Sequence, residues 1–145
     1  MGRIIYLLDT NILSEPIKKR PSHYVMGALE RHRGQWATCS IVWRELHYGL
    51  KRLSASKKKR EIGSYLDQLK NSNLRILPFD SYAAEWLGQE RARLEKAGLT
   101  PSYVDSEIAA IAVTRELTLV TRNLEDYKHF AGLQLENWFE EVEQT

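Results

Sequence analysis

The sequence lacks the features that define several classes of protein. It contains one cysteine, Cys39, so an internal disulfide framework is excluded and a reducing compartment is favoured. It has no apolar run near the roughly 20 residues that a membrane-spanning helix requires. Met1-Gly2-Arg3 leads directly into an apolar segment, which leaves no room for a cleavable signal. We therefore expect a cytoplasmic protein without a membrane segment.

Motifs for several common kinds of catalysis are also absent. No glycine-rich turn follows the first apolar segment, as a dinucleotide-binding site would require. A phosphatase of the haloacid dehalogenase type needs a second aspartate two residues after the first, and Asn11 occupies that position after Asp9. The histidines do not have the spacing of a metal-binding motif, at His23, His32, His47 and His129. These three kinds of site are therefore disfavoured.

The composition is that of an ordinary globular domain with clustered positive charge. The 145 residues, 43% hydrophobic and 28% charged, predict one domain over residues 1–145. The net charge is only +2, but lysine and arginine gather in the segments 18–20, 31–33 and 51–60. A solvated helix face explains such runs in most proteins, while the phosphates of a nucleic acid would also bind them. The charge pattern alone leaves both explanations open.

Apolar runs alternate with segments of helical periodicity along the chain. Short apolar runs predict strands at residues 4–8, 35–39, 74–79 and 117–121, with an edge strand at 133–136. Periodicity and capping residues predict helices that begin near Asn11, run over 24–33, 40–49, 62–69 and 81–96, and begin again at Asp105. The basic segment 51–60 is expected to bridge two of these helices. Strands that alternate with helices predict an α/β fold, in which helices flank a central, mainly parallel sheet.

Acidic and amide side chains recur near the ends of the predicted strands. Asp9 ends the first strand, Glu45 lies in the helix after the second, Asp105 lies in the first turn of a later helix, and Asn123 and Asp126 follow the fourth strand. In a parallel sheet these positions share the carboxyl edge, where open α/β sheets bind their ligands. Each also has a structural explanation, as a helix cap, a favourable charge at a helix N-terminus or an Asx turn.

Carboxylates that gather in one pocket raise one another's pKa unless a cation relieves the repulsion. A set of oxygen ligands suits a hard cation, Mg²⁺ or Mn²⁺. Such an ion activates water and stabilises negative charge on a phosphoryl oxygen. An acidic metal pocket with basic flanks is therefore compatible with a nuclease.

Four segments in order resemble the motifs of PIN-domain proteins. They are Leu8-Asp9-Thr10-Asn11, the segment 40–49 with its Glu45-Leu46 pair followed by Gly49, the segment 105–112, and the segment 119–127. Within that group the chain is similar to VapC-type toxin ribonucleases of bacterial toxin–antitoxin pairs. The ordered set spans nearly the whole chain.

The resemblance implies a Mg²⁺-dependent endoribonuclease, with Mn²⁺ as a substitute ion. Asp9 and Asp105 would chiefly hold the metal. Glu45 would complete the acidic pocket and help to hold the metal or its water. Thr10 or Asn11 would orient Asp9 by hydrogen bonds. Thr121 is a further residue expected to support the metal-binding residues.

The fourth motif departs from the fullest family pattern, because Asn123 stands where many PIN domains have aspartate. Asp126 is the candidate to supply the missing acid, and the choice between the two residues stays open. Asn123 also supports an alternative reading, a PIN domain with impaired metal binding that only binds RNA or protein.

The resemblance further implies partners and a substrate. A homodimer, a VapB-like antitoxin and contact with operator DNA only through that antitoxin are expected. The substrate would be RNA, in a transfer RNA or ribosomal RNA loop, since exposed loops are the usual targets of RNA recognition. Hydrolysis would leave 5′-phosphate and 3′-hydroxyl ends.

Overall fold

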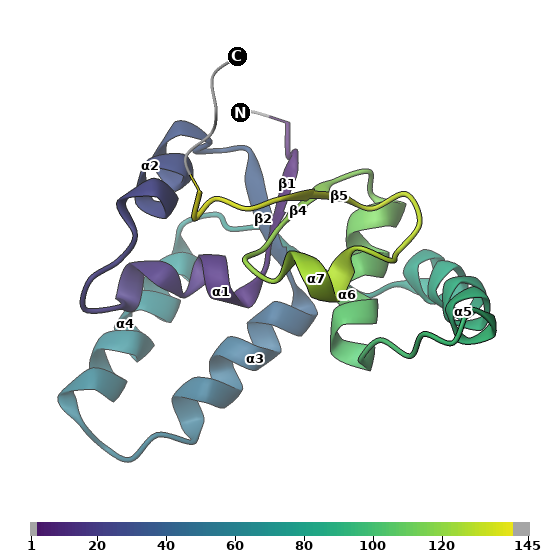
Figure 1. Cartoon of the computed structure of the whole chain (residues 1–145). Coiled ribbons are helices and arrows are strands. Elements are labelled where there is room, and N and C mark those ends of the chain that lie inside the picture. The colour runs from purple at the N-terminus through teal and green to yellow at the C-terminus, as the bar shows by residue number, and fades with distance from the viewer. Residues whose placement is uncertain (1–2, 141–145) are drawn as a thin grey trace.

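Five parallel strands form the sheet at the centre of the structure, a computed structural model that describes residues 3–140 (Figure 1). The strands lie in the order β3-β2-β1-β4-β5. They are β1 (Tyr6–Leu8), β2 (Trp36–Cys39), β3 (Ile76–Leu77), β4 (Thr118–Val120) and β5 (Gln134–Glu136). The predicted α/β fold with a parallel sheet is confirmed.

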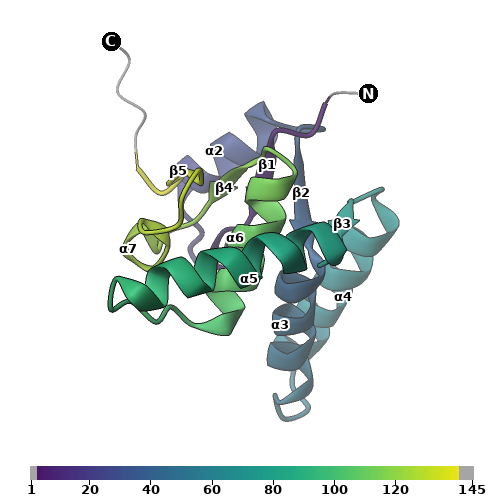
Figure 2. The ribbon, with the colours of Figure 1, turned by 90° about the vertical axis from the view of Figure 1, so that its right-hand side faces the viewer.

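Helices connect the strands and lie on both sides of the sheet. They are α1 (Thr10–Leu13), a 3₁₀ turn (Glu15–Ile17), α2 (His23–Arg31), α3 (Ser40–Lys51), α4 (Lys57–Asn71), α5 (Ser81–Lys96), α6 (Tyr103–Thr114) and α7 (Leu124–Tyr127). Helix α5 packs across α6 on one side of the sheet, and α2 lies on the other (Figure 2). Within residues 3–140 no helix is long and apolar enough to cross a bilayer.

The central strands are covered on both faces. Leu7 and Leu8 of β1 and Leu119 and Val120 of β4 have no exposed surface, which explains why these strands are unbroken apolar runs in the sequence. Cys39 is also fully buried, and burial raises the pKa of its thiol to about 11. Cys39 is therefore a residue of the hydrophobic core.

The strand order reverses its direction next to β1. The chain moves outward from β1 through β2 to β3, and then returns to place β4 and β5 on the other side of β1. Ligands of open α/β sheets bind at such a reversal, beyond the carboxyl ends of the strands. Here the Asp9 amide donates to the Val120 carbonyl at 2.9 Å, so the residue that follows β1 lies beside the last residue of β4.

Among the element boundaries that differ from the predictions, three have a clear local reason. The strand expected over 74–79 is only Ile76–Leu77, and the proline that follows, Pro78, has no amide proton to continue the ladder. Helix α6 begins before Asp105, because the Ser102 hydroxyl accepts from the Asp105 amide at 3.1 Å and serves as the N-cap. The basic segment is not a simple bridge. Its second half lies in α4, since the Ser56 hydroxyl caps that helix.

Candidate active site

Asp9 is buried at the reversal point and held by three donors. It is 5% exposed. One carboxylate oxygen, Oδ1, accepts from the Thr10 amide at 2.8 Å, so Asp9 does cap α1. The other, Oδ2, accepts from the Thr121 hydroxyl at 2.8 Å and from the Tyr127 hydroxyl at 3.2 Å. A side chain that served as a cap alone would not need donors from α7 and from the residue that follows β4.

Tyr127 brings a second carboxylate to the same place. Its hydroxyl oxygen lies 3.2 Å from Asp105 Oδ1 as well as 3.2 Å from Asp9 Oδ2. The phenol has one proton, so it can donate to only one of the two carboxylates at a time. Two acids from distant segments are therefore held on either side of one oxygen atom, as the parallel sheet led us to expect.

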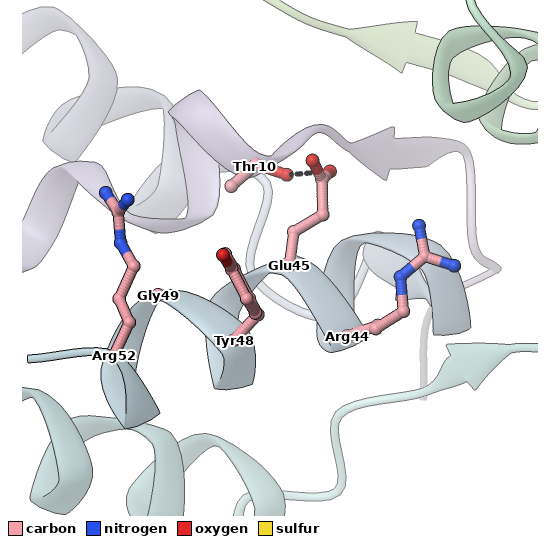
Figure 3. Close-up of a pocket in the computed structure, with 6 residues that line it drawn as sticks. All are labelled: Thr10, Arg44, Glu45, Tyr48, Gly49 and Arg52. Atoms are coloured by element: carbon pink, nitrogen blue, oxygen red, sulfur yellow. Dashed lines mark hydrogen bonds between the residues drawn. The ribbon is translucent and has the colours of Figure 1, made fainter.

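Glu45 lies beside this pair and reaches it through Thr10. The Thr10 hydroxyl donates to Glu45 Oε1 at 2.9 Å (Figure 3). Glu45 projects from α3, one turn after the end of β2, as the sequence predicted. Thr10 therefore hydrogen-bonds both acids, Asp9 through its backbone amide and Glu45 through its hydroxyl group.

Asn11 supports the loop after β4 rather than Asp9. Its Oδ1 accepts from the Arg122 amide at 3.0 Å, and its amide nitrogen donates to the Thr121 hydroxyl oxygen at 3.4 Å. Of the residues expected to support Asp9, Thr10 and Thr121 are therefore the two that contact it directly. The alternative expectation, that Asn11 hydrogen-bonds Asp9 itself, is not what the geometry shows.

The two candidates for the fourth position are both exposed. The Asn123 amide donates to the Thr121 hydroxyl oxygen at 3.1 Å, and the Asp126 amide donates to the Asn123 carbonyl at 3.1 Å. Within residues 3–140 neither side chain hydrogen-bonds Asp9 or Asp105. The charge of Asp126 nevertheless raises the pKa of Asp105, so of the two residues Asp126 adds to the negative field of the pair.

Both aspartates have raised pKa values, chiefly because they are buried and in part because other acids lie nearby. Burial, and then the charge of Glu45, raise the pKa of Asp9 against the hydrogen bonds that lower it. Burial and the charge of Asp126 raise the pKa of Asp105. Burial and the two aspartates raise the pKa of Tyr127, so its hydroxyl stays protonated. A cation between the aspartates would relieve this repulsion.

The donor set fits one kind of metal site. In the described part of the chain, no three acidic, histidine or cysteine side chains lie close enough together to hold an ion. Two carboxylates do converge, at Asp9 and Asp105. Mg²⁺ binds in this way, through one or two carboxylates, with waters and substrate phosphate in its remaining positions. The residues therefore fit Mg²⁺ at an open site.

Sequence reasoning missed the role of Tyr127. The residue ends the fourth motif, and it is 1% exposed. A buried tyrosine usually needs a partner for its hydroxyl, and the acids nearby in sequence were the available signal. Nothing in the sequence indicated that the hydroxyl would meet Asp9 and Asp105, which lie far from it along the chain.

Comparison with known proteins identifies the class to which this fold and site belong. The sequence profile of the PIN domain matches residues 6–133. The chain belongs to the PIN-domain family, and within it to the VapC group of toxin–antitoxin ribonucleases.

Two curated relatives and one solved structure support the assignment. The chain is 40% identical to Ribonuclease VapC2 of Rickettsia felis over 136 residues, 93% of this chain and 98% of that protein. It is 31% identical to the tRNA(fMet)-specific endonuclease VapC of Salmonella typhimurium, over 92% of this chain and 97% of that protein. The structure of VapBC2 from Rickettsia felis, bound to a DNA fragment from the promoter, matches with a TM-score of 0.79 and 37% identity, over 93% and 99% of the two chains.

Proposed function

We propose that this protein is the toxin of a toxin–antitoxin pair and acts as a Mg²⁺-dependent endoribonuclease that hydrolyses RNA phosphodiester bonds. The observation that carries the proposal is the convergence of Asp9 and Asp105 on the Tyr127 hydroxyl at the reversal of the strand order. The relatives named as ribonucleases support it.

Asp9 and Asp105 would hold Mg²⁺, or Mn²⁺ in its place, with Glu45 and Asp126 beside them. When bound, the ion would lower the pKa of water and neutralise charge on the phosphate. The protein itself would position the two carboxylates that hold the ion. Three donors fix the Asp9 carboxylate, and the protonated Tyr127 sets how far Asp105 can approach it. The site contains carboxylates and no histidine pair, which supports hydrolysis to 5′-phosphate and 3′-hydroxyl ends.

The RNA target is proposed to be a structured RNA with an exposed loop, such as a transfer RNA or ribosomal RNA. The Salmonella typhimurium relative is named a tRNA(fMet)-specific endonuclease, and the basic residues of α4 would favour a polyanion. A VapB-like antitoxin would inhibit the protein and carry its contact with operator DNA. The VapBC2 structure with promoter DNA supports this partner. A homodimer and a cytoplasmic location complete the proposal.

Cleavage of total cellular RNA by the purified protein, free of antitoxin, tests the function. We expect discrete cuts with Mg²⁺, none with EDTA, and none from Asp9→Asn or Asp105→Asn. These variants keep the shape of the side chain and remove its charge. Asp67→Asn, an exposed position on α4, is the matched control and should cut as the native protein does.

Two results would contradict the proposal. Products with 2′,3′-cyclic phosphate ends would exclude hydrolysis by water. Folded protein that cuts no RNA under any condition would favour a binding module, the alternative that Asn123 supports. In cells, the native chain expressed without antitoxin should arrest growth, and Asp9→Asn should not.

A further inference from the structure

A pocket of about 480 Å³ opens beside Glu45, along one side of α3. Thr10 and Glu45 form the end nearest the acids, and the rest of the lining is Arg44, Tyr48, Gly49 and Arg52. In Figure 3 the two arginines lie at opposite ends of the row, with Tyr48 between them. The volume is in the range of ligand sites, about 300–1,000 Å³.

Two arginines and a tyrosine lie in one row along α3 and its C-terminal end, with the tyrosine ring between the two positive charges (Figure 3). Arg44, Tyr48 and Arg52 are spaced four residues apart, and side chains at this spacing share a helix face. Tyr48 is 68% exposed, and the Arg52 guanidinium lies 6.0 Å from the centre of its ring. Within residues 3–140 neither Arg44 nor Arg52 is paired with a carboxylate, although Arg33, Arg93 and Arg115 are.

Gly49 lines the pocket and has free space where a side chain would lie, although the helix does not need a glycine at this position. A Cβ atom added there would meet no atom within 4 Å, and glycine is unfavourable inside a helix. Packing within the chain therefore does not explain this glycine. Gly88 of α5 is equally open, so what distinguishes Gly49 is its place in the pocket lining, where it leaves room for a ligand beside the helix backbone.

We propose that this pocket binds one nucleotide of the RNA strand next to the cleaved bond, with its base stacked on Tyr48. Arg44 and Arg52, at the two ends of the row (Figure 3), would bind phosphates of the strand on the two sides of that nucleotide. Aromatic rings stack bases of any kind, and arginines hold the backbone of single strands. The inference rests on the proposed function and adds a binding subsite to it.

The position of the pocket favours a nucleotide over a protein side chain. Thr10 lines the pocket and directly follows Asp9. A strand with its phosphate at Asp9 and Asp105 can therefore continue past Thr10 and Glu45 on one side of the site. On that path its next nucleotide would meet Arg44, Tyr48 and Arg52.

Binding of a fluorescein-labelled decauridine, followed by fluorescence anisotropy in EDTA, tests the subsite without cleavage. Tyr48→Ala should weaken binding roughly 5- to 150-fold, the range of one base–aromatic stack, and Tyr48→Phe should bind as the native protein does. Gly49→Leu would place a side chain inside the pocket and should also weaken binding. Arg44→Ala and Arg52→Ala should each lower the salt dependence by about one counterion.

The matched control is Tyr82→Ala, because Tyr82 on α5 is 74% exposed and does not line the pocket. It should leave binding unchanged. Tyr48→Ala that binds decauridine as tightly as the native protein overturns the subsite, even if RNA cleavage is confirmed. Tyr48→Ala that loses only its inhibition by antitoxin also overturns it and assigns the pocket to a protein. Tyr48-dependent binding by a protein that cuts no RNA would support the subsite and refute the catalytic proposal.

Discussion

Replacement of Tyr127 by phenylalanine tests whether the hydroxyl group sets the distance between the two aspartates. The ring is buried and would stay in the core, so the change removes one oxygen atom from the site. Asp9 would keep its donors from the Thr10 amide and the Thr121 hydroxyl, both at 2.8 Å. Asp105 would lose the oxygen that places it beside Asp9.

The expected loss of stability is small. The Tyr127 contacts are 3.2 Å long, beyond the usual 2.7–2.8 Å for hydroxyl donors. A net loss of about 1 kcal/mol follows from the usual range for a hydrogen bond, or roughly 3 °C in melting temperature for a domain of this size. The effect on metal affinity should be larger, because residues that orient metal ligands typically contribute 10- to 100-fold.

The assay is the rate of RNA cleavage measured across a range of Mg²⁺ concentrations. Tyr127→Phe should need at least about tenfold more Mg²⁺ for half of its maximal rate. High Mg²⁺ should restore most of the rate, because both carboxylates remain in place.

Tyr65→Phe is the matched control. Its hydroxyl donates to the Leu13 carbonyl at 2.6 Å, away from the acids, so its loss should lower stability without changing the Mg²⁺ requirement. The reasoning is refuted if Tyr127→Phe has the native Mg²⁺ requirement, or if Tyr65→Phe shifts it as much.

Three further predictions concern other parts of the molecule. Gly49→Ala should raise the free energy of unfolding by about 0.5–1 kcal/mol in chemical denaturation. Alanine has a higher helix propensity than glycine, and the new methyl group meets no atom within 4 Å. A loss of stability would show that the space beside Gly49 is not free. Glu90 is buried, and its hydrogen bonds from Arg93, and then from the Ala131 amide, lower its pKa below the ordinary 4.5. That stabilisation is present above pH 4.5 and is lost as the pH falls through the lowered pKa. The Glu90→Gln variant should therefore have a lower melting temperature than the native protein at neutral pH, and the difference should disappear in acid. A difference that did not change with pH would show that the charge of Glu90 is not the cause. Cys39 should resist alkylation at pH 8 until the protein unfolds, since it is buried and its pKa is raised to about 11; rapid labelling of the folded protein would exclude this burial.

The sequence by itself determined the class of fold and the places where the acids stand. An apolar run followed directly by Asp9, and the N-terminal position of Asp105 in a helix, are features of a few neighbouring residues. Strand and helix periodicity are local in the same way. These signals do not depend on the rest of the chain, which is why β1 and α5 were predicted close to where they lie.

The tertiary structure alone decided which side chains meet. That β4 rather than β3 lies next to β1 depends on how the crossovers pack, and this neighbour places Thr121 against Asp9. The bridge made by Tyr127, and the contacts of Asn11 with the β4 loop, join residues that no local pattern relates. Periodicity and capping are set by residues within one or two turns, whereas a hydrogen bond between distant segments exists only after the sheet has brought them together.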